Sequence, residues 1–265
     1  MMNNIRLKSN LDRASLDNRL QYDPEIIELY LRIDDLQQES LIRERIQELK
    51  QRGIRVYLHH PSRYNGKYLD IMSTEPEMYR FYRESTEQLV NICQEEGSQC
   101  VIHANYLRSD NPEISRARTI ALRQEIEAIL TYGRDTLLWE DSTEGLFCYN
   151  NPYLIDEVII PLKLPINVDV SHTFISFRGD NERLREVLER TAPYAVYYHL
   201  VDSMGQFHDS LPLGQGLIDW KMVKSFVQGK EYIFEINLEG GHIDCTPMVE
   251  SARFFDQLRI EAANL

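Results

Sequence analysis

The chain has 265 residues, of which 43% are hydrophobic and 27% charged, and its formal net charge is −13 at pH 7. This balance is typical of a globular protein and argues against a disordered chain. The acidic charge argues against binding to nucleic-acid phosphates, because those contacts need Lys and Arg.

Cysteine usage and the first residues bear on the compartment. The chain begins Met-Met-Asn-Asn-Ile-Arg, without an apolar signal region, and no apolar run is long enough to cross a membrane. The cysteines form no CxxC pair; they are Cys93, Cys100, Cys148 and Cys245. We therefore expect reduced thiols in a cytoplasmic protein that does not enter the membrane.

Apolar runs and helical periodicities alternate along the chain. Strands are predicted at residues 5–9, 26–31, 54–58, 100–102, 137–140, 166–170, 195–200 and 232–236. Helices are predicted at residues 41–52, 74–96, 112–132, 152–162, 181–190, 219–227 and 247–258. Thr74 is the predicted N-cap of the second helix, and Gly53, Gly97 and Gly133 end the first three. Segment 11–22 is polar and predicts neither element.

About eight strands alternating with helices predict a (β/α)8 TIM barrel. A length of 265 residues is normal for one such barrel, so we expect a single domain over residues 1–265. The active site of a barrel of this kind lies at the carboxyl ends of its strands. The side chains at those ends are therefore the first candidates for function.

Several of the predicted strands end in a histidine or a carboxylate. These residues are His103, Glu140, Asp169, His199 and Glu235. One strand-end histidine is more often a structural residue, but a series of such ends favours convergence on a metal. Carboxylate and imidazole ligands suit Mn²⁺, Mg²⁺, Co²⁺ or Zn²⁺.

The strand at 54–58 is followed by two histidines, His59 and His60. Side chains alternate along a strand, so only one of the two can face the barrel mouth. His242 follows the last strand and is predicted to be a loop residue.

Four segments resemble the xylose isomerase-like barrel superfamily, and the likeness extends over residues 26–255. The segments are Glu140-Asp141-Ser142-Thr143, Asp169-Val170-Ser171-His172, His199-Leu200-Val201-Asp202-Ser203 and Leu213-Gly214-Gln215-Gly216-Leu217-Ile218-Asp219-Trp220. That superfamily contains sugar isomerases and epimerases, and also abasic-site nucleases of the endonuclease IV type.

The resemblance implies a divalent metal bound by Glu140, Asp169, His199 and Glu235. It also implies that Glu140 and Glu235 form the catalytic pair, one as base and one as acid, on either side of the carbon that loses its proton. We therefore expect a metal-dependent isomerase or epimerase acting on a small sugar or sugar phosphate. Homo-oligomers are common among such barrels, although no interface is visible in the sequence.

The nuclease branch of the superfamily gives the first alternative. In its members, residues matching His60 and His103 bind a second metal that shares the first glutamate. Because the family's ligand sits next to the loop, the resemblance implies that His60, and not His59, faces the barrel mouth. A third metal uses the residue matching His172 with an Asp and a His, but here those two positions hold His208 and Ser210. The altered third site and the acidic charge argue against cleavage of abasic DNA. His60, His103, His172 and His208 remain candidates for a second metal or for the substrate. A non-catalytic, ligand-binding barrel is the other alternative.

Overall fold

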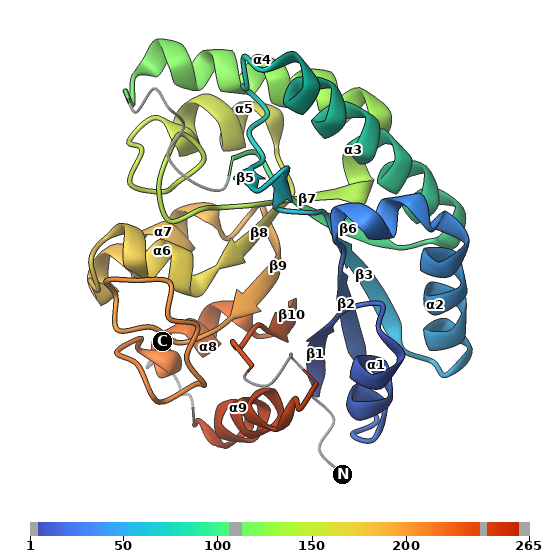
Figure 1. The fold of residues 1–265 in the computed structure, drawn as a ribbon. Helices are drawn as coiled ribbons and strands as arrows, with labels where there is room; N and C mark the ends of the chain where they lie inside the picture. The colour runs from blue at the N-terminus through green and yellow to red at the C-terminus, as the bar shows by residue number, and fades with distance from the viewer. Residues whose placement is uncertain (1–4, 106–112, 239–242, 260–265) are drawn as a thin grey trace.

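The computed structural model describes residues 5–105, 113–238 and 243–259. Parallel strands form a closed barrel in the order β1-β10-β9-β8-β7-β6-β3-β2 (Figure 1). The strands are β1 (Arg6–Ser9), β2 (Ile26–Tyr30), β3 (Arg55–His59), β6 (Gln99–His103), β7 (Leu137–Glu140), β8 (Ile166–Asp169), β9 (Ala195–Leu200) and β10 (Glu231–Phe234). The predicted (β/α)8 barrel is confirmed.

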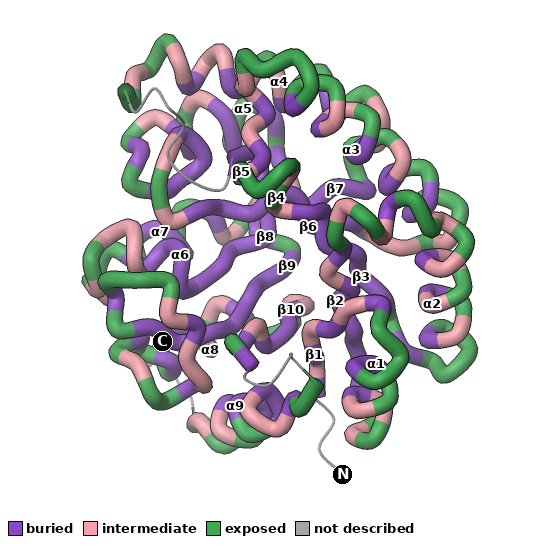
Figure 2. Tube along the Cα trace, viewed as in Figure 1, coloured by how far each residue is buried: buried purple, intermediate pink, exposed green. Residues whose placement is uncertain are grey.

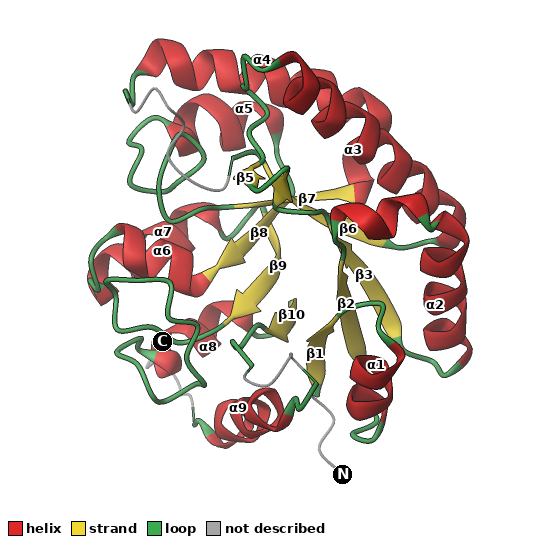
Figure 3. Ribbon diagram, viewed as in Figure 1, coloured by secondary structure: helices red, strands yellow, loops and turns green. Residues whose placement is uncertain are grey.

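Helices surround the barrel, and a short hairpin extends from its mouth (Figure 3). The helices are α1 (Arg13–Leu20), α2 (Glu39–Gln51), α3 (Pro76–Glu96), α4 (Arg116–Gly133), α5 (Ile160–Leu162), α6 (Val170–Ser176), α7 (Asn181–Thr191), α8 (Trp220–Val227) and α9 (Thr246–Gln257). Short 3-10 turns lie at Ile33–Gln37 and Arg134–Thr136, and a π-helical turn lies at Ile155–Ile159. The hairpin pairs β4 (Arg63–Tyr64) with β5 (Lys67–Tyr68).

Amphipathic spacing explains most of the helices. In α2, Ile42, Ile46 and Leu49 recur at helical intervals and are buried against the barrel. The helix α3 ends at Gly97, which adopts a left-handed conformation (φ 61°) that glycine tolerates without a steric penalty. Such periodicity can be read directly from the sequence.

Three local predictions were wrong or incomplete. Thr74 is not an N-cap, because α3 begins at Pro76 with Glu75 before it. The polar segment 11–22 contains α1, which buries little more than Ser15, Leu16 and Arg19. The helix α6 was not predicted; it begins directly after β8 because the Asp169 side chain accepts a hydrogen bond from its first turn. Pro112 and His242 lie outside the described residues.

A layer of six buried, mostly apolar side chains fills the barrel interior below the strand ends. Its members are Ile26, Tyr57, Val101, Leu138, Tyr197 and Ile233. The rings of Tyr57 and Tyr197 stack at 4.3 Å between centroids. Figure 2 shows the strands as buried and much of the outer helical surface as exposed. The layer forms a packed floor, so functional side chains lie one step above it.

Among the described residues, none of the helices combines the length and the apolar character needed to cross a bilayer.

Candidate metal centre

Each strand of the barrel contributes one ionisable side chain to a ring at the carboxyl ends, which we call the strand-end ring. In chain order it consists of Lys8, Glu28, His59, His103, Glu140, Asp169, His199 and Glu235. Strand pairing fixes the ring, since Lys8 is in register with Glu28 and Asp169 with His199. Six members lie two residues after a residue of the interior layer. Because strand side chains alternate with a period of two, they face inward as that layer does.

The first ligand group in the ring is Glu140, Asp169, His199 and Glu235. One ligand atom from each lies within 4.8 Å of the others. Nδ1 of His199 is 3.0 Å from Oε1 of Glu140, 2.6 Å from Oε2 of Glu235 and 4.0 Å from Oδ2 of Asp169. The structure therefore brings together all four residues predicted to bind a metal.

A second ligand group shares Glu140 with the first. Oε2 of Glu140 lies 3.1 Å from Nε2 of His59 and 3.2 Å from Nε2 of His103. The other oxygen, Oε1, faces His199. The Glu140 carboxylate thus has one oxygen toward each group, so it could serve both if each held a cation.

The prediction that His60 faces the mouth is wrong: His59 lies two residues after Tyr57 of the interior layer and faces inward with it, whereas His60 follows the end of β3 and faces the other way. Nδ1 of His60 donates to the carbonyl of Pro61, and Nε2 lies 2.8 Å from Oγ of Ser85 in α3. The ring is buried beside Tyr82. Burial lowers the pKa of His60 to about 4, so the imidazole is neutral near pH 7.

His172 and His208 lie beside the first group. Nδ1 of His172 donates to the carbonyl of Asp141, and Nε2 lies 2.8 Å from Nε2 of His208. Nε2 of His172 is also 3.8 Å from Oδ2 of Asp169. Oγ of Ser210, which takes the place of the family's histidine, is 3.5 Å from Nδ1 of His208. The two histidines face each other across the edge of the ring.

Lys8 and Glu28 are the ring members that the sequence did not single out. The ammonium of Lys8 pairs with Glu235, and it lies 3.5 Å from Oε1 of Glu28. Nε2 of His199 donates to Oε2 of Glu28 at 2.8 Å. A charged residue inside the apolar run 26–31 was the available signal for Glu28, but that residue does not end the run.

The charges in the ring shift one another's titration. Burial raises the pKa of the Glu140 carboxyl, but His103 and His199 outweigh burial and hold it well below the usual range. Burial also raises the pKa of the Glu235 carboxyl, but the positive charges of Lys8 and His199 outweigh burial and hold that pKa well below the usual range. Burial lowers the pKa of His199, yet Glu140, Glu28 and Glu235 together raise it well above the usual value. The ring is thus a set of carboxylates that attracts positive charge.

Hydrogen bonding shows that the ring fits a divalent cation. Nδ1 of His59 donates to the carbonyl of His60, which leaves Nε2 directed toward the Glu140 carboxylate. Among the described residues, no donor reaches the buried oxygens Oδ2 of Asp169 and Oε2 of Glu235 with hydrogen-bond geometry. Imidazole nitrogens and carboxylate oxygens that converge in this way form a mixed donor set that suits Mn²⁺, Mg²⁺, Co²⁺ or Zn²⁺.

A cavity of about 730 Å³ opens above the ring. Glu140, Glu235 and four histidines (His59, His103, His172 and His208) line its inner end. The rest of its lining is mixed. The polar and charged residues include Ser9, Asn10, Asp12, Arg19, Tyr30, Arg32, Ser62, Ser210 and Asn237, and the apolar ones are Ile236, Leu238 and Met248. This volume falls in the usual range for small-molecule sites.

The sequence model of the family described as xylose isomerase-like TIM barrel matches residues 22–258. The chain belongs to this family. The matched range contains every member of the strand-end ring except Lys8. No curated protein sequence matches the chain.

Solved structures of the same fold cover almost the whole chain. The TTHB071 protein of Thermus thermophilus, from a crystal soaked with ZnCl2, is 21% identical, with 96% of each chain covered and a TM-score of 0.71. A D-tagatose 3-epimerase-like protein is 14% identical, with 95% of this chain and 96% of that one covered, at the same TM-score of 0.71. The IOLI protein with a binding zinc atom is 15% identical, with coverage of 95% and 96% and a TM-score of 0.64. These likenesses support the fold.

Proposed function

We propose that this protein is a divalent-metal-dependent isomerase or epimerase of a small sugar or sugar phosphate. The observation that carries the proposal is the placing of Glu140 and Glu235, whose carboxylates both reach Nδ1 of His199 and both line the cavity. Two carboxylates beside one cation, at the end of a small-molecule cavity, suit removal of a proton next to a carbonyl. Proteins of the same fold that are named as sugar epimerases support the substrate class.

Each residue of the site has a separate role in the proposed reaction. Glu140, Asp169, His199 and Glu235 would hold the cation, which supplies Lewis-acid polarisation of neighbouring substrate oxygens. Glu235, kept ionised by the ammonium of Lys8, takes the proton from the carbon next to the carbonyl. Glu140 stands on the other side of that carbon; because its carboxyl is ionised in the free protein, it would first take up a proton from solvent and then return it to the substrate. Ser9, Asn10, Tyr30 and Asn237 offer neutral donors and acceptors for substrate hydroxyls.

Hydrogen exchange tests this function before the substrate itself is identified. The protein, loaded with Mn²⁺, is incubated in D2O with a panel of ketoses and ketose phosphates, and deuterium next to the carbonyl is measured by NMR. We expect exchange with at least one compound and its loss in Glu235→Gln. Glu250→Gln, which alters an exposed carboxylate on α9, is the matched control. Exchange that is as fast in Glu235→Gln as in the unaltered protein contradicts the proposal.

A second candidate function is phosphodiester hydrolysis by two metal ions. The bridging position of Glu140, with His59 and His103 on its second oxygen, favours it specifically. Two-metal sites activate a water and stabilise the leaving oxygen together. This candidate predicts cleavage of abasic duplex DNA that is abolished in His59→Ala and His103→Ala and retained in His60→Ala. The net charge of −13 weighs against it as the main function.

A further inference from the structure

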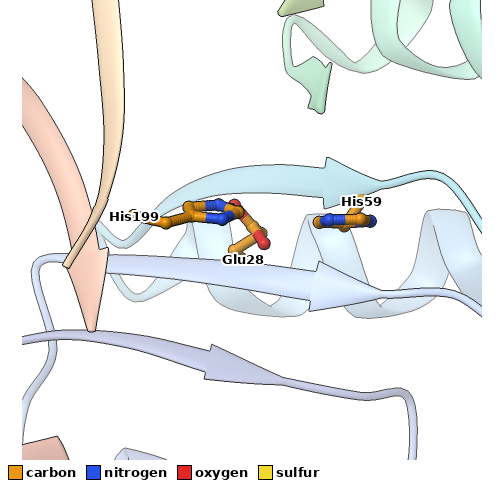
Figure 4. Close-up of side chains that lie close together, drawn as sticks. All are labelled: Glu28, His59 and His199. Atoms are coloured by element: carbon orange, nitrogen blue, oxygen red, sulfur yellow. The ribbon is translucent and has the colours of Figure 1, made fainter. Parts of the chain in front are cut away.

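Glu28 lies inside the barrel between two histidines of the ring, and Figure 4 shows its carboxylate beside His199, with His59 further along. Glu28 and His199 are both fully buried. Ligand atoms of Glu28, His59 and His199 lie within 4.8 Å of one another. Glu28 can therefore either bind a cation directly or orient a residue that does.

The partners of the two ring nitrogens of His199 distinguish these two roles of Glu28. Nε2 is 2.8 Å from Oε2 of Glu28, whereas Nδ1 faces Glu140 and Glu235. In the metal-free protein both nitrogens face carboxylates. A cation in the first ligand group would replace the proton on Nδ1, and the remaining N–H of the neutral ring, on Nε2, would donate to Glu28. If Nε2 bound a cation with Glu28, Nδ1 would carry the proton and be lost to the first ligand group.

The position of Lys8 also indicates that Glu28 orients His199 and does not bind a cation. Its ammonium lies 3.5 Å from Oε1 of Glu28 and pairs with Glu235 on the other side. The ammonium lies on the side of the Glu28 carboxylate that does not bond to His199, and it balances the charge of that carboxylate without a divalent cation. Glu28 thus has a lysine on one oxygen and an imidazole N–H on the other.

The contact is not a by-product of strand pairing. Glu28 is in β2, whose neighbours are β1 and β3, while His199 is in β9, whose neighbours are β8 and β10. The hydrogen bond therefore spans the barrel interior. Burying a carboxylate there costs free energy that an apolar side chain of similar size avoids. A role at the metal centre accounts for that cost.

We propose that Glu28, with Lys8 beside it, is a positioning residue that holds His199 with its Nδ1 lone pair toward the first ligand group. The inference rests on the metal site of the proposed function. Carboxylates that orient a metal-bound histidine usually contribute about 10–100-fold to metal affinity. Glu28 would do so without touching the substrate or the cation.

Metal affinity, measured without any substrate, tests the inference. Zn²⁺ affinity is obtained by competition with a chromogenic chelator, and the absorption spectrum of bound Co²⁺ reports the ligand geometry. We expect Glu28→Gln to bind Zn²⁺ about 10–100-fold more weakly and to change the Co²⁺ spectrum. Glu25→Gln, an exposed carboxylate just before the same strand, should match the unaltered protein. Far-UV circular dichroism checks the fold of each variant.

Unaltered Zn²⁺ affinity and an unaltered Co²⁺ spectrum in Glu28→Gln overturn the inference. The proposed function fails separately, if Glu140→Gln keeps full Zn²⁺ affinity. Should Glu28→Gln not fold, ¹⁵N NMR of histidine rings in the Zn²⁺-loaded protein replaces it, with His199 assigned by His199→Asn. A protonated Nε2 and a metal-bound Nδ1 support the inference, and the reverse overturns it.

Discussion

Oε2 of Glu140 lies 3.1 Å from Nε2 of His59, although the two residues are 81 positions apart in the chain. The neighbouring His60 faces α3 instead. The two adjacent histidines therefore make a matched pair for mutation. They have the same chemistry and nearly the same place in the sequence, but they face opposite sides of the barrel wall.

We predict that His59→Ala weakens binding at the second ligand group and leaves the fold intact. His60→Ala should leave metal binding unchanged and lower the free energy of unfolding by about 1–3 kcal/mol, because it removes a buried hydrogen-bond partner of Ser85. Zn²⁺ titration and urea unfolding of both variants measure the two effects. If His60→Ala weakens metal binding and His59→Ala does not, His60 is the metal ligand, as the sequence predicted.

Glu140 should matter to both ligand groups, whereas Glu235 belongs only to the first. We expect Glu140→Gln to weaken cation binding at both ligand groups and Glu235→Gln to weaken it at the first group only. In the hydrogen-exchange assay, each substitution should slow exchange by about 10²–10⁴-fold, the usual contribution of a general acid or base. Equal loss of metal from both variants would show that Glu140 does not bridge.

Lys8→Met should destabilise the metal-free protein and strengthen its metal binding. The substitution leaves Glu28 and Glu235 without their ammonium partner, which costs about 2 kcal/mol at this partly exposed site. A divalent cation replaces the missing charge and no longer meets repulsion from the lysine. The rise in melting temperature on adding Zn²⁺ should thus be larger in Lys8→Met than in the unaltered protein.

Lys67→Met, on the exposed hairpin, controls for the loss of a lysine outside the ring. The prediction fails if Zn²⁺ raises the melting temperature of Lys8→Met and Lys67→Met equally.

His60 makes stability depend on pH. Its pKa is about 4 in the folded protein because the ring is buried, against 6.5 for an unperturbed histidine. As pH falls, His60 takes up a proton in the unfolded chain before it does so in the folded protein. The contribution of His60 to the free energy of unfolding is therefore complete above pH 6.5 and is lost progressively down to about pH 4. The loss amounts to about 3 kcal/mol.

Urea unfolding of the metal-free protein between about pH 7.5 and about pH 4.5 measures this effect. The free energy of unfolding of His60→Asn should decline less steeply over that range than that of the unaltered protein. Parallel pH profiles for the two proteins would contradict the assignment.

The sequence was sufficient for the barrel and for five of the ring residues. In a parallel barrel the carboxyl end of a strand is also the mouth, so an apolar run that closes on His103, Glu140 or His199 determines where that side chain lies. The period of two along each strand then decides which way it faces. Both rules depend only on local sequence.

Residues whose place depends on distant partners could not be predicted in this way. Glu28 lies within an apolar run, and its partner His199 comes from the other side of the barrel. The choice between His59 and His60 depends on which alternate side chains of β3 face inward, and both faces of this strand carry apolar residues. The helix α6 starts at Val170 without a turn residue, because Asp169 ends β8 and caps the helix at once. An error of one residue in the choice of the inward set reverses every side chain of the strand.

The most direct test of the metal centre is the number of divalent cations bound per chain, in the unaltered protein and in Asp169→Asn. The substituted amide would keep an oxygen for the hydrogen bond that starts α6, but the first ligand group would lose a carboxylate charge. Equilibrium dialysis against Zn²⁺ or Mn²⁺, followed by elemental analysis, counts the ions. We expect the unaltered protein to bind at least one cation tightly and the Asp169→Asn variant to lose it. A protein that binds no cation, or an Asp169→Asn variant that retains the full count at unchanged affinity, would contradict it.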